Sequence, residues 1–139
     1  MKKVSGNLTE HISIDDYGVN QTGTIKISPE AILHALMVDE FIEWMSWKND
    51  PPINAFFRTA AYNKSVGGIS TSNHLKGTAT DLGVGEFTNE RFNKYARKWK
   101  EICEKHGVVG EIGRYDWGIH LGSHITYSNK FTIFDKRTA

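Results

Sequence analysis

The chain has one cysteine, no long apolar run and almost no net charge. A lone cysteine, Cys103, cannot make an internal disulfide, and its place on a helical apolar face predicts a small buried side chain. No apolar stretch is long enough to span a bilayer, and residues 4–10 lack the apolar run of a secretory signal. Internal repeats and low-complexity tracts are also missing. These absences exclude an internal disulfide and a membrane-spanning segment.

The charge balance gives no sign of an electrostatic partner. Seventeen basic and sixteen acidic residues leave a formal charge of +1, which provides no field for steering toward nucleic acid or an acidic membrane. With 39% hydrophobic and 24% charged residues, the composition is that of a soluble globular protein. A length of 139 residues fits a single domain over residues 1–139, which we expect to be a monomer.

Two stretches have the apolar periodicity of core helices. Residues 28–47 begin with Ser28-Pro29, a favourable helix start, and the expected buried stripe there is Ile32, Leu33, Leu36, Met37, Phe41, Trp44 and Met45. Residues 89–105 form the second helix, with a buried face of Phe92, Tyr95, Ala96, Trp99, Ile102 and Cys103. Its basic residues read as a solvated outer face.

The remaining elements are short. We expect strands at 53–57, 78–84, 108–115 and 117–121, a helical turn at 60–64, and a last strand or hairpin from 124–127 and 131–134. Residues 1–27 are polar and read as an arm of short extended pieces lying on the domain. The predicted fold is therefore α+β, with two main helices packed on a small, mostly antiparallel sheet.

Residues 72–81 lack the periodic apolar face of a core helix or strand, which predicts a functional site in this stretch. A loop carries His74 and the following strand carries Asp81, and one more nitrogen donor would complete a zinc site with three protein ligands and an open position. We choose His120, because apolar residues alternate around it as on a half-buried strand. His124 is a reserve ligand or a pocket histidine, and His34 on the first helix reads as structural or solvent-facing.

Residues of this stretch also carry a family resemblance. Ser72-x-His74-x-x-Gly77-x-Ala79-x-Asp81 resembles, at every fixed position, the signature of the zinc D-alanyl-D-alanine carboxypeptidase family. That family includes VanX dipeptidases and phage L-alanyl-D-glutamate endolysins, and it shares its fold with the zinc domain of hedgehog. The upstream segments 57–63 and Val66-Gly67-Gly68, and the downstream Gly113-Arg114-Tyr115 and Ile119-His120, are similar to further family motifs. The resemblance spans roughly residues 30–125.

The resemblance implies a peptidase acting on bacterial peptidoglycan. Zn²⁺ held by His74, Asp81 and His120 would lower the pKa of bound water and polarise a scissile carbonyl. Ser72 and Arg58 would contact the substrate's carboxylate or its reacting carbonyl, and Arg58 would have a catalytic role in stabilising a developing oxyanion. The bond cut would be that between L-Ala and D-Glu, as in phage endolysins, or that of D-Ala-D-Ala. Without a signal peptide, such a protein would be made in the cytoplasm and reach the wall after release by another factor.

The general base is the least determined residue. Several family members have a Glu or Asp three positions before the closing histidine, where this chain has Trp117. We prefer Asp116 as the catalytic base, because residues four apart on a regular strand share a face with each other, and Glu111 is the next candidate. Family members often have His-x-Asp at the closing motif, whereas this chain has Gly122, so a carboxylate that orients His120 would have to come from elsewhere.

A binding module of the same fold is the alternative function. In the hedgehog domain this fold keeps zinc and serves in binding, so the altered acidic positions here could mark a zinc-stabilised, inactive protein. An enzyme should place a carboxylate within hydrogen-bond reach of the metal-activated water, whereas a binding module can lack one.

Overall fold

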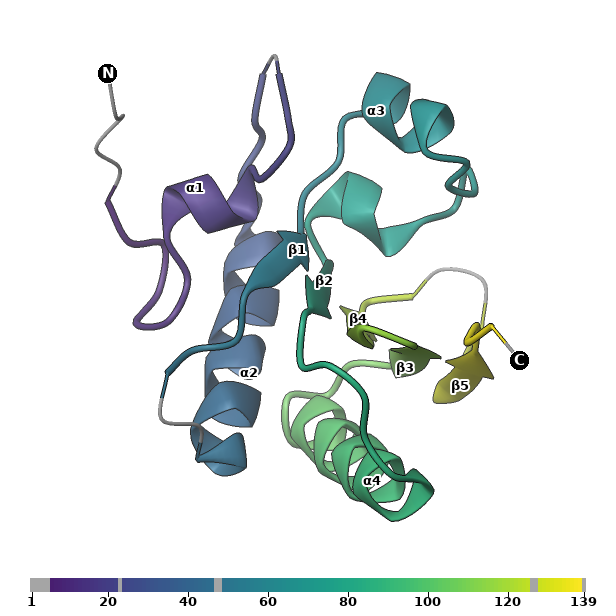
Figure 1. Cartoon of the computed structure of the whole chain (residues 1–139). Helices are drawn as coiled ribbons and strands as arrows, with labels where there is room; N and C mark the ends of the chain where they lie inside the picture. The colour runs from purple at the N-terminus through teal and green to yellow at the C-terminus, as the bar shows by residue number, and fades with distance from the viewer. Residues whose placement is uncertain (1–5, 23, 47–48, 126–127, 139) are drawn as a thin grey trace.

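A five-stranded sheet with helices against it forms the body of the protein (Figure 1). The computed structural model describes residues 6–22, 24–46, 49–125 and 128–138. The strands lie in the order β1-β2-β4-β3-β5, and only the β3–β5 pair is parallel. The predicted α+β class, with a mostly antiparallel sheet, is confirmed.

Helix α2 (Pro29–Met45) begins as the sequence predicts, with Ser28 accepting a hydrogen bond from the N–H of Ala31. Its buried face differs from the predicted stripe: Ile32, Leu36 and Trp44 are more than one-third exposed. The buried residues are Ala31, His34, Ala35, Met37, Val38, Asp39, Phe41 and Ile42. Apolar residues surround this helix on most sides, so periodicity alone could not select the face that packs on the sheet. Trp47, the predicted last residue, lies outside the described residues.

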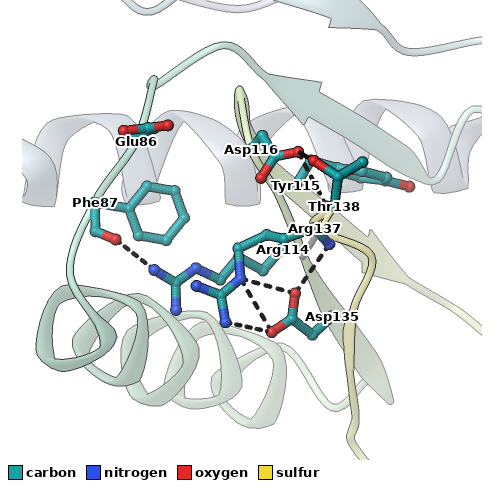
Figure 2. Close-up of a pocket in the computed structure, with 8 residues that line it drawn as sticks. All are labelled: Glu86, Phe87, Arg114, Tyr115, Asp116, Asp135, Arg137 and Thr138. Atoms are coloured by element: carbon teal, nitrogen blue, oxygen red, sulfur yellow. Dashed lines mark hydrogen bonds and ion pairs between the residues drawn. The ribbon is translucent and has the colours of Figure 1, made fainter.

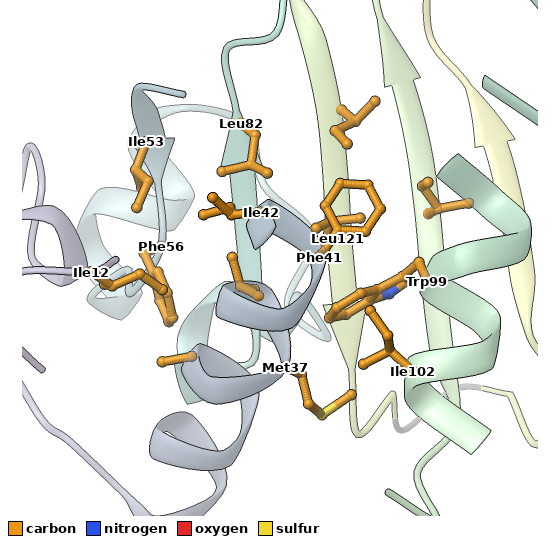
Figure 3. Close-up of a cluster of buried hydrophobic side chains, with 14 of the residues drawn as sticks. Ile12, Met37, Phe41, Ile42, Ile53, Phe56, Leu82, Trp99, Ile102 and Leu121 are labelled. Atoms are coloured by element: carbon orange, nitrogen blue, oxygen red, sulfur yellow. The ribbon is translucent and has the colours of Figure 1, made fainter. Parts of the chain in front are cut away.

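Helix α4 (Asn89–Lys105) has the predicted bounds and the predicted buried face. The side chain of Trp99 is fully buried in the core that α2, α4 and the sheet share, and its indole N–H donates to the carbonyl oxygen of Gly122 at 2.9 Å (Figure 3). Cys103 is buried as expected, and burial raises the pKa of its thiol to about 12. None of the helices among the described residues is long and apolar enough to cross a membrane.

Strands β1 (Ile53–Ala55), β2 (Ala79–Leu82) and β3 (Gly110–Tyr115) are shorter than predicted, whereas β4 (Gly118–Ser123) and β5 (Thr132–Asp135) lie one or two residues further toward the C-terminus. Strand β5, predicted as a last strand or as one half of a hairpin with residues 124–127, pairs in parallel with β3. Residues 124 and 125 lie outside any strand, and the rest of the predicted 124–127 piece lies outside the described residues. Leu82, Ile112, Ile119 and Leu121 are fully buried in the core on the helix side. Side chains at the alternate positions therefore point to the opposite face of the sheet.

The N-terminal arm is partly helical, contrary to the prediction of extended pieces. Ser13 caps a single turn, α1 (Ile14–Tyr17), and Tyr17 at its end is fully buried. The Tyr17 ring packs on Phe56 and Phe57, with ring centroids 4.9 and 5.6 Å away. Two small helical elements follow β1, α3 (Ala60–Ser65) and the 3₁₀ turn η1 (Asn73–Lys76). The residue predicted to lie in a loop, His74, is therefore in a defined turn.

Candidate metal centre

Three separate elements bring His74, Asp81 and His120 together. His74 lies in η1, Asp81 on β2 and His120 on β4, and the last two are direct partners across the β2–β4 ladder. Among the described residues, one ligand atom from each of the three lies within 4.8 Å of the others, and all three residues are buried. Two imidazoles and a carboxylate match the donor set and the number of protein ligands of a zinc site with an open position.

The turn that carries His74 is fixed on both sides. Ser72 caps it by accepting a hydrogen bond from the His74 N–H at 3.2 Å, and Gly77 ends it with a φ of +69°. A Cβ at position 77 would lie 2.3 Å from the Tyr17 hydroxyl oxygen, so glycine also permits the close approach of the arm. The His74 Nδ1 donates to the carbonyl oxygen of Phe56 at 2.6 Å. That hydrogen bond leaves Nε2, which lies 3.4 Å from Asp81 Oδ2, as the ligand atom.

His120 lies between two carboxylates. Its Nδ1 is 2.9 Å from Asp81 Oδ1, and its Nε2 is 2.9 Å from Glu111 Oε1. Burial opposes a charged imidazole, but the hydrogen bonds to both carboxylates raise the pKa of His120 to about 9. Burial likewise opposes ionisation of Asp81, yet the neighbouring His74 and His120 hold its pKa below its usual value. The two carboxylates would favour a bound cation, and a divalent ion would take the place of the proton on His120 Nδ1.

Glu111 occupies space that Gly122 leaves open. The two residues are direct partners across the β3–β4 ladder, and a Cβ on Gly122 would lie 2.5 Å from Glu111 Cγ. Glu111 Oε1 also accepts a hydrogen bond from Asn73 Nδ2 at 3.0 Å, whereas its buried Oε2 has no partner among the described residues. The carboxylate that orients His120 therefore comes from Glu111 on the neighbouring strand. The sequence had shown only that Gly122 could not supply it.

Arg58 lies near the Asp81 oxygen that does not contact His120. Its Nη2 is 3.8 Å from Asp81 Oδ2, and its Nη1 donates to Asn63 Oδ1 at 3.4 Å. The backbone N–H of Arg58 donates to the carbonyl oxygen of His74, which fixes this residue beside the centre. Its buried Nε has no hydrogen-bond partner among the described residues, so the guanidinium keeps donors for a ligand. Both predicted substrate-binding residues, Arg58 and Ser72, line one cavity of about 480 Å³ together with His74, His120 and Glu111.

Asp116 lies in a different pocket. Strand β4 begins at Gly118, so Asp116 is in the β3–β4 turn and the regular strand that would align it with His120 does not reach it. The Asp116 carboxylate accepts hydrogen bonds from the hydroxyl and the N–H of Thr138, at 2.6 and 3.0 Å (Figure 2). The structure thus places Glu111, the second candidate, beside His120 and leaves Asp116 outside the cavity that His74 and His120 line.

The remaining histidines do not join the centre. His34 is fully buried on the helix side of the sheet, where its ring nitrogens contact Thr80 and Ser123 hydroxyl oxygens at 2.9 and 2.7 Å. His124 adopts a φ of +52° and lines a separate pocket. Among the described residues, the other group with metal-ligand geometry is Glu10, His11 and Glu43, which lies on the surface.

Comparison with known proteins supplies the family. The model of the peptidase M15 family matches residues 17–121, which include the three candidate ligands, Arg58 and Glu111. The chain belongs to the peptidase M15 family. The resemblance seen in the motifs is thereby confirmed, and membership supports a metallopeptidase. A search of curated proteins found no match.

Several residues at the centre of this M15 member escaped the sequence analysis. Asn73 lies inside the motif at a position that the signature leaves open, and Phe134 on β5 lies beyond the matched residues. The contact of Glu111 with His120 depends on cross-strand register, which the sequence did not specify. The glycine at position 122 was the one signal of this contact in the sequence, because a residue without a side chain leaves room for the side chain of its cross-strand partner.

Proposed function

We propose that the protein is a zinc peptidase that hydrolyses peptide bonds in the stem peptides of bacterial peptidoglycan. The observation that carries this proposal is the meeting of His74, Asp81 and His120. Two of them, His74 and His120, line one cavity together with Arg58 and Glu111. Its volume of about 480 Å³ lies in the range of ligand pockets. A zinc ion held by the three residues would supply Lewis-acid activation of water and of the scissile carbonyl. The likeness of the motifs to those of peptidoglycan peptidases supports the substrate class.

Glu111 is the proton acceptor in this proposal. Its Oε1 holds the His120 ring through Nε2, which leaves Nδ1 for the metal. Its Oε2 is buried without a partner among the described residues, so it is available to take a proton from the attacking water. A carboxylate at the centre is the feature that separates an enzyme from a zinc-stabilised binding module, and Glu111 therefore favours the enzyme.

Arg58 and Ser72 bind the substrate in this proposal. The Arg58 guanidinium is held beside Asp81 with donors to spare, and it would bind a substrate carboxylate or the oxygen that gains charge during attack. The Ser72 hydroxyl faces the same cavity from the start of η1. Cleavage between L-Ala and D-Glu and cleavage of D-Ala-D-Ala both fit these roles.

The test is digestion of soluble peptidoglycan fragments by the zinc-loaded protein, with products identified by mass spectrometry. We expect wild-type protein to give one defined new terminus. Glu111→Gln should lower turnover by about 10²–10⁴-fold, because a general base contributes on that order. Asp116→Asn is the matched carboxylate control and should cut at close to the wild-type rate.

Zinc content of each variant is measured alongside, so that loss of a base is separated from loss of metal. Intact fragments after incubation with zinc-loaded wild-type protein would favour the binding module. If Asp116→Asn lost turnover while Glu111→Gln kept it, the assignment of the base to Glu111 would be wrong.

A further inference from the structure

The cavity at the metal centre has one wall that the matched family region does not contain. One side is formed by the segment 66–69 and the η1 turn, within the matched residues 17–121. The other side is formed by three side chains of the C-terminal segment, Thr132, Phe134 and Lys136. We call these three residues the β5 wall. Because it lies beyond the matched region, the β5 wall is a place where this chain can set its own substrate preference.

The absence of a side chain at Gly113 lets the β5 wall approach the metal centre closely. Phe134 is the parallel partner of Gly113, and a Cβ at position 113 would lie 2.1 Å from the Phe134 ring. The ring therefore lies over the bare backbone of Gly113 and reaches His120, with 5.4 Å between ring centroids. Side chains two residues apart on a strand share a face, which places Lys136 beyond Phe134 on the same side. The Lys136 N–H donates to the carbonyl oxygen of Arg114 at 2.8 Å, so the pairing with β3 extends to this residue.

Lys136 is a cation without a carboxylate partner among the described residues. Its Nζ lies 5.5 Å from the centroid of the Phe134 ring, and the side chain is exposed. The neighbouring arginines have other partners: Arg137 pairs with Asp135 at 2.7 Å, and Arg114 donates to the Phe87 carbonyl oxygen (Figure 2). Arg114 also donates to Asn89. Lys136 is thus the basic residue of the β5 wall that is available to a ligand.

The cavity therefore has a cation on each side of the metal centre. The Arg58 guanidinium lies beside Asp81 on β2, and Lys136 follows β5. Three strand intervals separate β2 from β5 in the order β2-β4-β3-β5. At about 4.8 Å per interval, β2 and β5 are on the order of 14 Å apart across the sheet, the length of about four residues of extended peptide. His120 lies between them.

We propose that Lys136 binds a carboxylate of the substrate on the side of the scissile bond away from Arg58. The substrate class is then an acidic peptide that occupies the cavity on both sides of the metal centre and is cut at an internal bond. This inference rests on the proposed function, which supplies the peptide substrate. Of the two bonds considered, it favours the one between L-Ala and D-Glu over removal of a terminal D-Ala.

The test uses a set of fluorescent stem peptides in which each carboxylate is replaced in turn by its amide. Binding to the zinc-loaded protein is recorded by rapid mixing, before turnover, and products are identified afterwards by mass spectrometry. In wild-type protein, amidating one particular carboxylate should weaken binding about tenfold, as loss of a charge-assisted hydrogen bond does. Lys136→Met should bind the acidic peptide about tenfold more weakly and should no longer respond to that amidation.

Two variants serve as controls. Lys136→Arg keeps the charge and should retain the response, and Lys130→Met removes an exposed lysine outside the cavity and should bind like wild type. An unchanged response to amidation in Lys136→Met would overturn the proposal, as would release of only the C-terminal residue. Binding without any cleavage would instead count against the peptidase, because the binding measurement tests Lys136 separately.

Discussion

At the residue scale, the side chains around His120 depend on two glycines. Gly122 leaves space for Glu111, and Gly113 leaves space for Phe134. Both glycines lie beside His120 on the face of the sheet opposite the helices, one on its own strand and one directly across the β3–β4 ladder. The imidazole is thus held by a carboxylate at Nε2 and by an aromatic ring. Such supporting contacts fix the orientation of a ligand and raise its basicity.

The sequence could predict the candidate ligands, but it could not predict that Glu111 and Phe134 contact His120. His74 and Asp81 share one short motif, and His120 lies in an alternating strand pattern, so each carries a local signal. The role of Glu111 depends on which residue of β3 pairs with Gly122, and a shift of one position would turn it to the other face. Asp116 was preferred on the assumption of a regular strand, but the turn at residues 116–117 interrupts it.

His34 predicts a pH dependence of stability. Burial, followed by the nearby His120 and His74, holds its pKa well below the usual 6.5, so the folded protein keeps this imidazole neutral. Below pH 6.5 the unfolded chain binds a proton at this position that the folded chain does not, and stability falls as pH falls. His34→Asn loses a hydrogen bond and should be less stable at pH 7.5 by about 1–3 kcal/mol. This deficit should shrink by about 1 kcal/mol at pH 5.5, because the variant lacks the titrating group.

Urea denaturation of metal-free wild-type and variant protein at the two pH values measures the deficit. Contributions of the other histidines are common to both proteins and cancel in the difference. A deficit that stayed constant or grew toward pH 5.5 would contradict a neutral, buried His34.

At the scale of elements, the two long helices show when apolar periodicity is enough to predict which face of a helix is buried. Helix α4 has apolar residues on one side and basic residues on the other, so its buried face and its bounds were predictable. Helix α2 has apolar residues on most sides, and the face that packs on the sheet is the one with Ala31, Ala35 and His34. Small residues there permit close packing, a criterion that hydrophobicity alone does not contain. The parallel pairing of β5 with β3 is a long-range choice without a local signal.

A buried carboxylate of α2, Asp39, holds the N-terminal arm. Asp39 is buried and accepts hydrogen bonds from the Thr9 hydroxyl, the Glu10 N–H and the His11 N–H, at 3.0, 3.1 and 3.2 Å. Asp39→Ala should lower the free energy of unfolding by about 2–4 kcal/mol, because it leaves the buried Thr9 hydroxyl and two N–H groups unpaired. Urea denaturation measures the loss, and hydrogen exchange of residues 9–11 should become faster.

Glu43→Ala provides the matched control, since Glu43 is an exposed acid on the same helix whose contact with His11 is a surface ion pair, and its removal should change stability by no more than about 0.5 kcal/mol. If Asp39→Ala matched this control in stability and in exchange, the arm would be held by other contacts.

At the scale of the whole molecule, the sheet separates the core from the site. Helices α2 and α4 pack with Leu82, Ile112, Ile119 and Leu121 on one face. Asp81, His120 and Glu111 alternate with these residues and lie on the other face, where His74 of η1 meets them. A rigid core thus supports a centre made of side chains from η1, β2, β3 and β4, the arrangement that a metal site with fixed geometry requires.

The zinc content of the purified protein tests whether His74, Asp81 and His120 form a metal centre. Purified protein is equilibrated with a small excess of zinc, desalted and analysed for metal per chain, with circular dichroism to verify folding. We expect one zinc in wild-type protein and essentially none in His74→Ala, because two remaining protein ligands do not retain the ion. His11→Ala, in the surface group with Glu10 and Glu43, is the matched histidine control and should keep one zinc. A full equivalent of zinc in folded His74→Ala, or its loss in His11→Ala, would contradict the assignment of the metal centre.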